Sequence, residues 1–428
     1  MMNLLPNWLK PIAGAYLVGG CVRDLLLARL PTDYDVVLLG DAPGYARALA
    51  ATIGGRIIEI GKPAFRVWRV AAGRHIIDVA PAAGGSIAED LRRRDFTINA
   101  LAIHAATGEV IDITAGREDL ASRTIRMVSP AAFRADPVRL LRAFRFAARL
   151  GFAIDPQTRA AIGREAELIG ASASERIREE LFKLLAVTAA HAHVAGMRQA
   201  GLLQAIFPGL EPTQIEPSLQ SLQALETILE GFPSFPQDLA ERLSEEFPEH
   251  RRVLLKCAAL LQSLDRTRKV GADRLAGALN RLRLSRRDAD RLESLIRPNT
   301  LVDGLVAGGH VSAATEVHFL RTAGSLAPDF LILAMAMRSA GTVLPAELPR
   351  SGTAPIIQLL WNYFFRYRPK LLSPPPINGE DLIREFGLRP SPRFKEILDR
   401  VDEERLLRES FTRAEALELV RAYLEKHP

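Results

Sequence analysis

The pattern of hydrophobic and polar positions changes near Gly116. Before it, short apolar runs rich in β-branched residues are separated by glycine, proline and polar turns. These runs predict strands in AYLVGG, YDVVLLG, GRIIEIG, FRVWRVA, RHIIDVA and GEVIDI, with a helix in GYARALAATI between two of them. Residues 15 to about 115 are therefore expected to form an α/β or α+β domain.

After Gly116, strand signals almost vanish and amphipathic helical patterns dominate. The longest are DPVRLLRAFRFAARL, ASERIREELFKLLAV, VLLKCAALLQSL, DRLAGALNRLRL, RDADRLESLI, RFKEILDRVDEERLL and FTRAEALELVRAYLEK. Turn signals such as FPGLEP, GFPSFP and LSPPPING separate them. The whole pattern predicts one small mixed domain followed by a long helical body.

Length, charge and cysteine content narrow the class of protein. The chain has 428 residues and a net charge of +6 from 56 Lys and Arg against 50 Asp and Glu. Such a length suits roughly two to four domains. A basic chain suits a polyanionic partner, although solubility alone explains an excess of this size equally well. Cys21 and Cys257 lack CxxC spacing, so we expect neither a disulfide framework nor a zinc site.

Targeting signals are not evident in the sequence. The start, MMNLLPNWLKP, lacks the charged and long apolar regions of a signal peptide. The longest apolar run, roughly Phe330 to Met337, is too short to span a bilayer. We therefore expect a soluble, cytoplasmic protein with no membrane partner.

The stretch LVGGCVRDLLLARLPTDYDVVLLG contains a candidate phosphate site. Gly19 and Gly20 stand between a predicted strand and a predicted helix, and Arg23 follows one turn into that helix. This geometry can aim backbone N–H groups and a guanidinium at a phosphate. Taken alone, a glycine pair is more often an ordinary turn.

Two aspartates in the same stretch form a candidate metal site. Asp33 and Asp35 are two residues apart at the start of an apolar strand, so both side chains project from one face. A hard cation such as Mg²⁺ offsets the repulsion between two adjacent carboxylates. Asp78, inside the apolar run HIIDVA, is a candidate third carboxylate. The alternatives are a chance DxD on a solvent-facing edge, and an Asp78 that pairs with a nearby arginine.

The order of the motifs resembles one enzyme family. GGCVRD, DYD, EDLRRRDFTINA, DITAGREDL and RADPVRLLRAFRFAARLGF follow one another between residues 16 and 152, and LLQAIFPGL and PINGEDLIREFGLRPSPRFKEIL extend the match. Together they resemble the class II tRNA nucleotidyltransferases (CCA-adding enzymes) and the related bacterial poly(A) polymerases. The resemblance implies an α+β fold: a polymerase β-like nucleotidyltransferase head with a mixed sheet, then an all-α neck, body and tail. The expected boundaries are 1–120 for the head, 121–215 for the neck and 216–428 for the body and tail.

The resemblance also implies roles for individual residues. Asp33 and Asp35 would bind Mg²⁺, with Asp78 as a further catalytic carboxylate. The expected nucleotide-binding residues are Gly19, Gly20, Arg23, Arg93, Arg94, Asp95, Asn99, Asp136, Arg139, Arg142 and Arg145. Among them, Asp136 and Arg139 would read the base of the incoming nucleotide, and the later arginines would meet phosphate.

The spacing of the last four residues has its own consequence. Asp136, Arg139, Arg142 and Arg145 recur every third residue, so on one helix they would fan round one side. Val138, Leu141 and Ala148 would then face the helical body. A solvated charged surface is the usual explanation of such a stripe. The family resemblance favours a cleft instead.

The implied reaction is attack of an RNA 3′-hydroxyl on the α-phosphate of CTP or ATP, adding C, A or both to the tRNA 3′ end. The helical body would grip the acceptor and T arms of the tRNA. Only ten residues, VAPAAGGSIA, separate Asp78 from Glu89, where relatives carry a longer loop linked to A addition. A CC-adding enzyme is therefore an alternative. A poly(A) polymerase, faintly suggested by KPAFRVWRV, and an inactive RNA-binding homologue are further alternatives.

Two other departures from the family pattern carry expectations. Ala135 stands where many relatives have glutamate before Asp136, which could alter how the following helix is positioned. Gln262 and Ser263 replace a His–Asp pair that binds metal in some relatives. We therefore expect a structural helix and no second metal activity there.

Overall fold

The computed structural model describes residues 5–9, 12–61, 66–265, 270–297, 312–340 and 354–427. Its contacts divide the chain into two units. The first unit is Met1–Pro208 with Arg281–Arg283, and the second is Gly209–Asn280 with Leu284–Pro428. The finer division into 1–120, 121–215 and 216–428 stays a prediction. Residues 62–65 of the KPAFRVWRV stretch lie outside the described residues.

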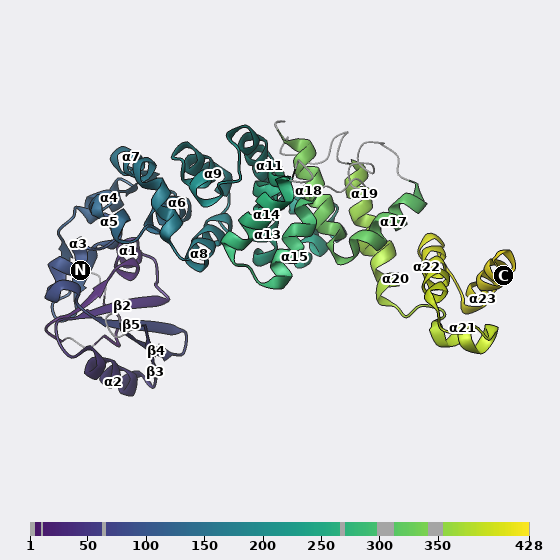
Figure 1. Ribbon diagram of the computed structural model, residues 1–428. Helices are drawn as coiled ribbons and strands as arrows, with labels where there is room; N and C mark the ends of the chain where they lie inside the picture. The colour runs from purple at the N-terminus through teal and green to yellow at the C-terminus, as the bar shows by residue number, and fades with distance from the viewer. Residues whose placement is uncertain are drawn as a thin grey trace. The chain divides into compact units, whose positions relative to one another are not determined.

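A seven-stranded mixed sheet forms the N-terminal part of the first unit (Figure 1). Its spatial order is β3 (Arg56–Ile60), β4 (Val67–Ala72), β5 (His75–Pro81), β2 (Asp33–Leu38), β1 (Ala15–Val18), β6 (Leu101–His104) and β7 (Val110–Asp112). Only β2 and β5 pair in parallel, and the other neighbours are antiparallel. The mixed sheet expected from the sequence is confirmed. The sequence pattern does not predict β6, which is four residues long and almost entirely buried, so it shows no alternation.

The two faces of this sheet are covered differently. On one face α2 (Ala42–Ile53) packs against β3, β4 and β5, over the buried side chains of Val70 and Ile77. On the other face, Val18 and Val37 pack with Leu91 of α3 (Ile87–Arg92). Asp35 is two residues before Val37 on β2, so its side chain projects from this same second face. Unlike Val37, Asp35 is exposed.

The ends of the head helices follow from local chemistry. The Asp41 side chain accepts a hydrogen bond from Gly44 N at 2.9 Å and caps α2, which ends at Gly54 in a left-handed conformation. Ser86 caps α3 in the same way. Helix α1 (Gly20–Leu26) starts directly after β1, as the glycine pair predicts. These caps fix where the loops next to the sheet begin.

The remaining helices of the first unit complete its neck region. They are α4 (Gly116–Ala121), α5 (Ala131–Ala135), α6 (Arg139–Leu150), α7 (Pro156–Glu165), α8 (Ser174–Leu185), α9 (Ala190–Gln199) and α10 (Leu202–Ile206). A short parallel pair, β8 (Thr124–Ile125) and β9 (Ala153–Ile154), joins the start and end of this region. Helix α6 packs on both α8 and α9.

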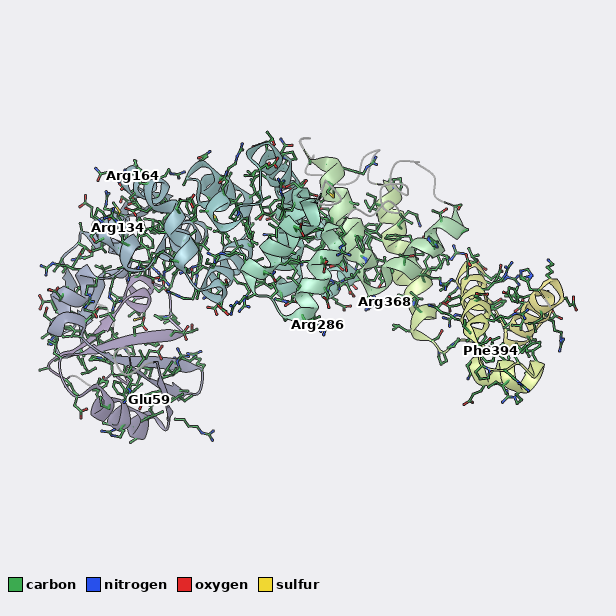
Figure 2. All side chains as sticks on the ribbon, viewed as in Figure 1. Glu59, Arg134, Arg164, Arg286, Arg368 and Phe394 are labelled. Carbon is green, nitrogen blue, oxygen red and sulfur yellow. The ribbon has the colours of Figure 1, made fainter. Side chains whose placement is uncertain are left out.

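The second unit is helical throughout its described residues. Its helices are α11 (Pro212–Glu230), α12 (Gln237–Glu246), α13 (Glu249–Leu261), α14 (Val270–Leu282), α15 (Arg286–Ile296), α17 (Ala313–Ala323), α18 (Ala327–Ser339), α19 (Ala354–Asn362), α20 (Arg368–Leu372), α21 (Gly379–Phe386), α22 (Pro392–Leu407) and α23 (Arg413–Lys426). The last three share a core that includes Leu382, Ile397 and Val420. Figure 2 labels Phe394, which packs against this core.

One stretch of the second unit has the length and apolar composition of a membrane-spanning helix. It runs from Ala313 to Ser339, and 72% of its most apolar window is buried inside the protein. Burial of that extent is what a core helix of a globular unit shows.

Candidate active site

Asp33 and Asp35 lie on the same exposed face of β2, with Tyr34 buried between them on the other face. Register places Asp35 directly beside Asp78 of the parallel strand β5. Desolvation raises the pKa of Asp35; the charge of Arg94 opposes this, and those of Asp78 and Asp33 add to it. The three carboxylates predicted from the sequence are therefore brought together at one place on the sheet.

The carboxylates differ in their partners. Asp78 accepts two hydrogen bonds from Arg69 of β4, from Nε and from Nη2, both at 2.8 Å. The alternative in which Asp78 pairs with an arginine is thus what the structure shows. Asp33 and Asp35 supply adjacent carboxylate oxygens, a donor set that fits a hard divalent cation. Within the described ranges, no group of three or more His, Cys, Asp or Glu side chains is placed to hold a metal ion.

Gly19 allows a close approach at the end of β1. Its φ of +77° lies in the region that favours glycine. A Cβ atom there would lie 2.8 Å from Arg94 Nη1 and 3.2 Å from Asp35 Oδ2. Arg94 itself donates from Nε and Nη2 to Asp90 at 3.0 and 2.8 Å, which fixes its guanidinium beside Asp35. Gly20 is already the first residue of α1, so the helix starts two residues before the predicted VRDLLLARL.

Arg23 does not face the open side of the glycine turn. Its side chain is only 4% exposed, and its Nη1 donates to Asn99 Oδ1 at 2.7 Å. Its Nε donates to Asp24 at 2.9 Å. The expectation that Arg23 reaches a triphosphate is therefore not met in this structure, because the first turn of α1 directs the side chain into the interior.

A buried polar network continues from Arg23 through the RRD segment. Asn99 Nδ2 donates to Asp95 Oδ1 at 3.0 Å, and Arg142 Nε donates to Asp95 Oδ2 at 2.9 Å. Burial alone would raise the pKa of Asp95, but the charge of Arg142 and the hydrogen bonds from Asn99, Arg142 and Phe96 hold it below its usual value. Asp95 thus links the head to the first long helix of the neck, and its oxygens are already engaged by protein groups.

The prediction of a single helical stripe from Asp136 to Arg145 is wrong. Asp136 precedes Pro137 and is extended, with φ −153° and ψ 93°, because the proline ring disfavours the helical region for the residue before it. Helix α6 begins only at Arg139. Arg145 also departs from the expected cleft. Its side chain is 7% exposed, and its guanidinium pairs with Glu180 and lies 3.9 Å from the centre of the Phe146 ring. Val138 and Leu141 are buried as expected, whereas Ala148 is half-buried.

Asp136 and Arg139 nevertheless lie close to each other. The Arg139 Nε to Asp136 Oδ2 distance is 3.8 Å. Arg176 of α8 binds both Asp136 oxygens, from Nη1 at 2.9 Å and from Nη2 at 2.8 Å. The sequence reading did not single out Arg176 or Glu180. Their signal was present in SERIREEL, four residues apart and so on adjacent turns of one helix.

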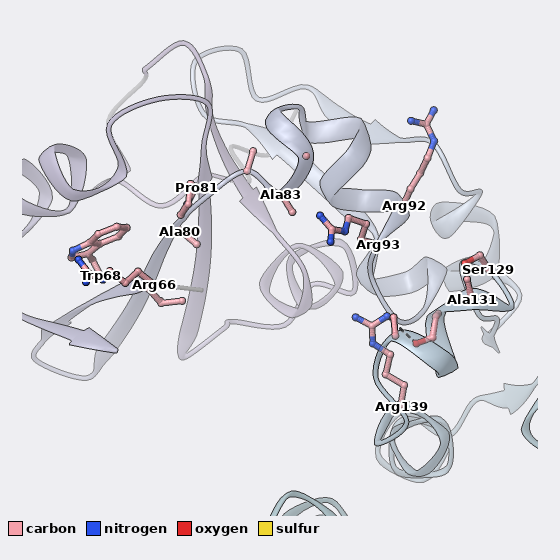
Figure 3. A pocket seen from close by; sticks show the side chains of 15 residues that line it. Arg66, Trp68, Ala80, Pro81, Ala83, Arg92, Arg93, Ser129, Ala131 and Arg139 are labelled. Atoms are coloured by element: carbon pink, nitrogen blue, oxygen red, sulfur yellow. Dashed lines mark hydrogen bonds between the residues drawn. The ribbon is translucent and has the colours of Figure 1, made fainter. Parts of the chain in front are cut away.

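A cavity of about 1050 Å³ opens between the head sheet and the start of the neck (Figure 3). Its lining includes four arginines and no acidic residue: Arg66, Val67, Trp68, Ala80, Pro81, Ala82, Ala83, Gly84, Arg92, Arg93, Ser129, Ala131, Ala132, Ala135 and Arg139. Arg93 and Arg139 were predicted from the sequence, whereas Arg66 and Trp68 were not assigned a role. The size and charge of the cavity suit an anionic ligand as large as a nucleotide.

Two family models match the chain. One describes a "Poly A polymerase head domain" and covers residues 15–126, and the other, a "Probable RNA and SrmB- binding site of polymerase A", covers residues 151–213. A relative named "A-adding tRNA nucleotidyltransferase" from Deinococcus radiodurans is 32% identical over 97% of this chain and 96% of its own length. The chain belongs to the tRNA nucleotidyltransferase and poly(A) polymerase family.

Other members of this family show the same likeness. A "CC-adding tRNA nucleotidyltransferase" from Geobacter sulfurreducens is 38% identical, over 63% of this chain and 65% of that protein. A solved structure described as "The complex structure of CCA-adding enzyme with ATP" has a TM-score of 0.74 and 25% identity, covering 96% of this chain and 90% of that one. The predicted family and fold are therefore confirmed.

One family segment differs here in a defined way. Ser263, which the sequence resemblance aligns with a metal ligand of some relatives, is buried and hydrogen-bonded to Ser218, with their Oγ atoms 2.9 Å apart. Gln262 and Ser263 follow α13 in a short 3₁₀ turn. The expectation that this place has no second metal activity stays a prediction.

Proposed function

We propose that this chain transfers nucleotides from CTP to the 3′ end of tRNA in the cytoplasm, and that it stops after adding two C residues. The proposal that addition stops after two C residues rests on the short segment between Asp78 and Glu89. After β5 it forms one 3₁₀ turn, Ala83–Gly85, and then α3 begins. Ala83 N donates to Asp90 Oδ1 at 3.3 Å, so the turn is tied to α3. The segment is therefore too short to contain the longer loop that the family resemblance links to A addition.

The geometry of the site supports the transfer reaction. Arg93 and Arg139 line a cavity without acidic residues, and Arg94 connects the RRD segment to Asp35. A nucleoside triphosphate in this cavity can therefore be bound by arginines while its phosphates extend toward the carboxylates. Asp136, held by Arg176, and Arg139 offer an acceptor and a donor for the edge of a base.

In the reaction, the 3′-oxygen of the RNA forms a bond to the α-phosphorus of CTP. The bond between that phosphorus and the oxygen that bridges the α- and β-phosphates breaks. Pyrophosphate leaves with the electron pair, and the hydroxyl proton passes to solvent. Asp33 and Asp35 would hold Mg²⁺, which when bound would activate the hydroxyl and neutralise charge on the leaving group. Arg94 offsets the negative charge of Asp35 before substrate arrives.

Nucleotide incorporation tests the proposal. The substrate is a tRNA transcript that lacks its three terminal nucleotides, incubated with CTP, ATP and Mg²⁺, and the product 3′ end is sequenced. We expect two C residues with the wild-type chain and none with Asp35→Asn. Absence of any incorporation by the wild type would contradict the transfer activity, and a homopolymer of A would favour the poly(A) polymerase alternative.

An A-adding enzyme is a second candidate, because the relative with that name matches 97% of this chain. It predicts incorporation of A into a tRNA that already ends in CC, and no incorporation of C.

A further inference from the structure

The carboxylates of β2 divide the exposed face of the head sheet into two sides. Toward β1 lie Gly19 and the Arg94 guanidinium, both close to Asp35. Toward β5 and β4 lie first Asp78 and then Arg69, because register pairs Asp35 with Asp78 and Asp78 with Arg69. The guanidinium groups of Arg94 and Arg69 thus lie on opposite sides of Asp35 across the sheet. Both charges lower the pKa of Asp35, against the effect of its desolvation.

Arg69 is held in one orientation. Asp78 accepts from its Nε and Nη2, which is the two-point geometry that fixes a guanidinium plane. The side chain of Arg69 is still 39% exposed. Among the described residues its third nitrogen, Nη1, has no protein partner. The result is a fixed cation with an open edge, one strand away from the carboxylate of Asp78 and two from that of Asp35.

The surface next to Arg69 is apolar and open. Ile58 of the edge strand β3 pairs with Arg69 and projects from the same face. It is 52% exposed, and Ile60 and Ile76 on this face are 39% and 37% exposed. Glu59, labelled in Figure 2, marks the same edge strand but alternates to the opposite face. A fixed guanidinium beside exposed apolar side chains matches a nucleotide, which joins a phosphate to a flat apolar base.

The two sides of the carboxylate pair suit the two substrates of the transfer. In nucleotidyl transfer, the attacking and leaving oxygens lie in line on opposite sides of the phosphorus. Arg94 approaches Asp35 from the β1 side, and Arg93 next to it lines the cavity. The cavity reaches β4 and β5 at Val67 and Ala80, but Arg69, two residues beyond Val67 on β4, does not line it. We propose that Arg69, positioned by Asp78, binds the 3′-terminal phosphodiester of the RNA, and that Ile58 supports its terminal nucleoside. This inference rests on the proposed function and names the RNA side of the same site.

Steady-state kinetics of Arg69→Leu test it, with KM measured separately for CTP and for a tRNA lacking its three terminal nucleotides. We expect the KM for tRNA to rise about tenfold or more and the KM for CTP to stay within about twofold, because one charge-assisted phosphate contact is lost. Arg47→Leu, an exposed arginine on α2 across the sheet, is the matched control and should change neither constant. Arg69→Lys keeps the charge but not the two-point pairing, and should give an intermediate rise.

Two further readouts separate the outcomes. A structural role of Arg69 would lower the thermal midpoint and change both KM values in parallel, which would overturn the inference. A rise confined to the KM for CTP would place Arg69 on the triphosphate side and would also overturn it. Asp78→Asn should raise the KM for tRNA less than Arg69→Leu, because the guanidinium remains but is no longer fixed. If the wild-type chain incorporates no nucleotide into any RNA, the proposed function itself fails.

Discussion

Arg142 donates to Asp95 across 47 positions of sequence, with Nε 2.9 Å from Oδ2, and so ties the RRD segment of the head to helix α6. The Asp95 side chain is 7% exposed, and Asn99 Nδ2 and Phe96 N both donate to its other oxygen, Oδ1. The Asp95 charge is therefore buried and fully hydrogen-bonded, whereas its partner Arg142 is half-buried. The contribution of this pair to the free energy of unfolding is best tested by removing one partner at a time.

Arg142→Met should destabilise the fold by about 3–5 kcal/mol, because it leaves the Asp95 charge buried without its counter-ion. Urea denaturation at pH 7 measures the loss. The surface pair Arg134–Glu165, whose arginine is 72% exposed and labelled in Figure 2, provides the control. Arg134→Met should cost far less, because solvent screens an exposed ion pair. Equal losses in the two variants would contradict the special role of the Arg142–Asp95 pair.

The same pair sets a pH dependence. Because the pKa of Asp95 is lowered in the folded state, its stabilising contribution is fully present above the unfolded value of about 3.9. It is lost as the pH falls through the folded pKa. The stability gap between wild type and Asp95→Asn should therefore be constant from about pH 5 to pH 7 and close only below about pH 4. A gap that closes between pH 5 and pH 7 would contradict this assignment.

The pKa of Asp35 is shifted in the opposite direction from that of Asp95. Its pKa is raised in the folded state, so the ionised form opposes folding at neutral pH and the opposition disappears as the pH falls. Asp35→Asn should abolish nucleotide incorporation but raise the thermal midpoint at pH 7, and the gain should shrink at pH 4. Differential scanning calorimetry at the two pH values measures it. An unchanged or lowered midpoint at pH 7 would contradict the interpretation.

The glycine pair offers a matched comparison of backbone strain. Gly19→Ala should destabilise the fold by about 1–3 kcal/mol, because an L residue is strained at φ +77° and its Cβ would lie 2.8 Å from Arg94. Gly20→Ala meets only an ordinary 3.5 Å contact with Arg23 and begins a helix, so its stability should be equal or up to about 1 kcal/mol higher. Urea denaturation of both variants checks the difference, and similar losses would contradict it.

Arg176 should affect which nucleotide is chosen. Arg176→Leu removes both hydrogen bonds to Asp136 and frees its carboxylate to rotate. We expect the preference for CTP over UTP and GTP, measured as a ratio of kcat/KM values, to fall about tenfold or more, since one lost bidentate contact is worth about 1–3 kcal/mol. Arg134→Leu, on α5, serves as the control, and an unchanged ratio for Arg176→Leu would exclude this positioning role.

Much of the site could be predicted from the sequence, because its residues lie in local patterns. The DYD alternation correctly put Asp33 and Asp35 on one face, and the glycine pair correctly marked the boundary between β1 and α1. The three-residue spacing wrongly predicts that Asp136 is helical, because Pro137 disfavours the helical region for the residue before it. Partners such as Arg69 for Asp78 and Arg176 for Asp136 depend on strand order and helix packing, which no local pattern specifies.

The short turn from Ala83 to Gly85 is the reason to expect that this chain adds two C residues and no A. A direct comparison of C addition and A addition tests this expectation. Two tRNA transcripts are compared under single-turnover conditions with excess enzyme, one lacking all three terminal nucleotides with CTP, and one ending in CC with ATP. We predict that the first gains two C residues and that the second gains no A over the same time. Addition of A to the second transcript at a rate close to that of C addition would contradict the account.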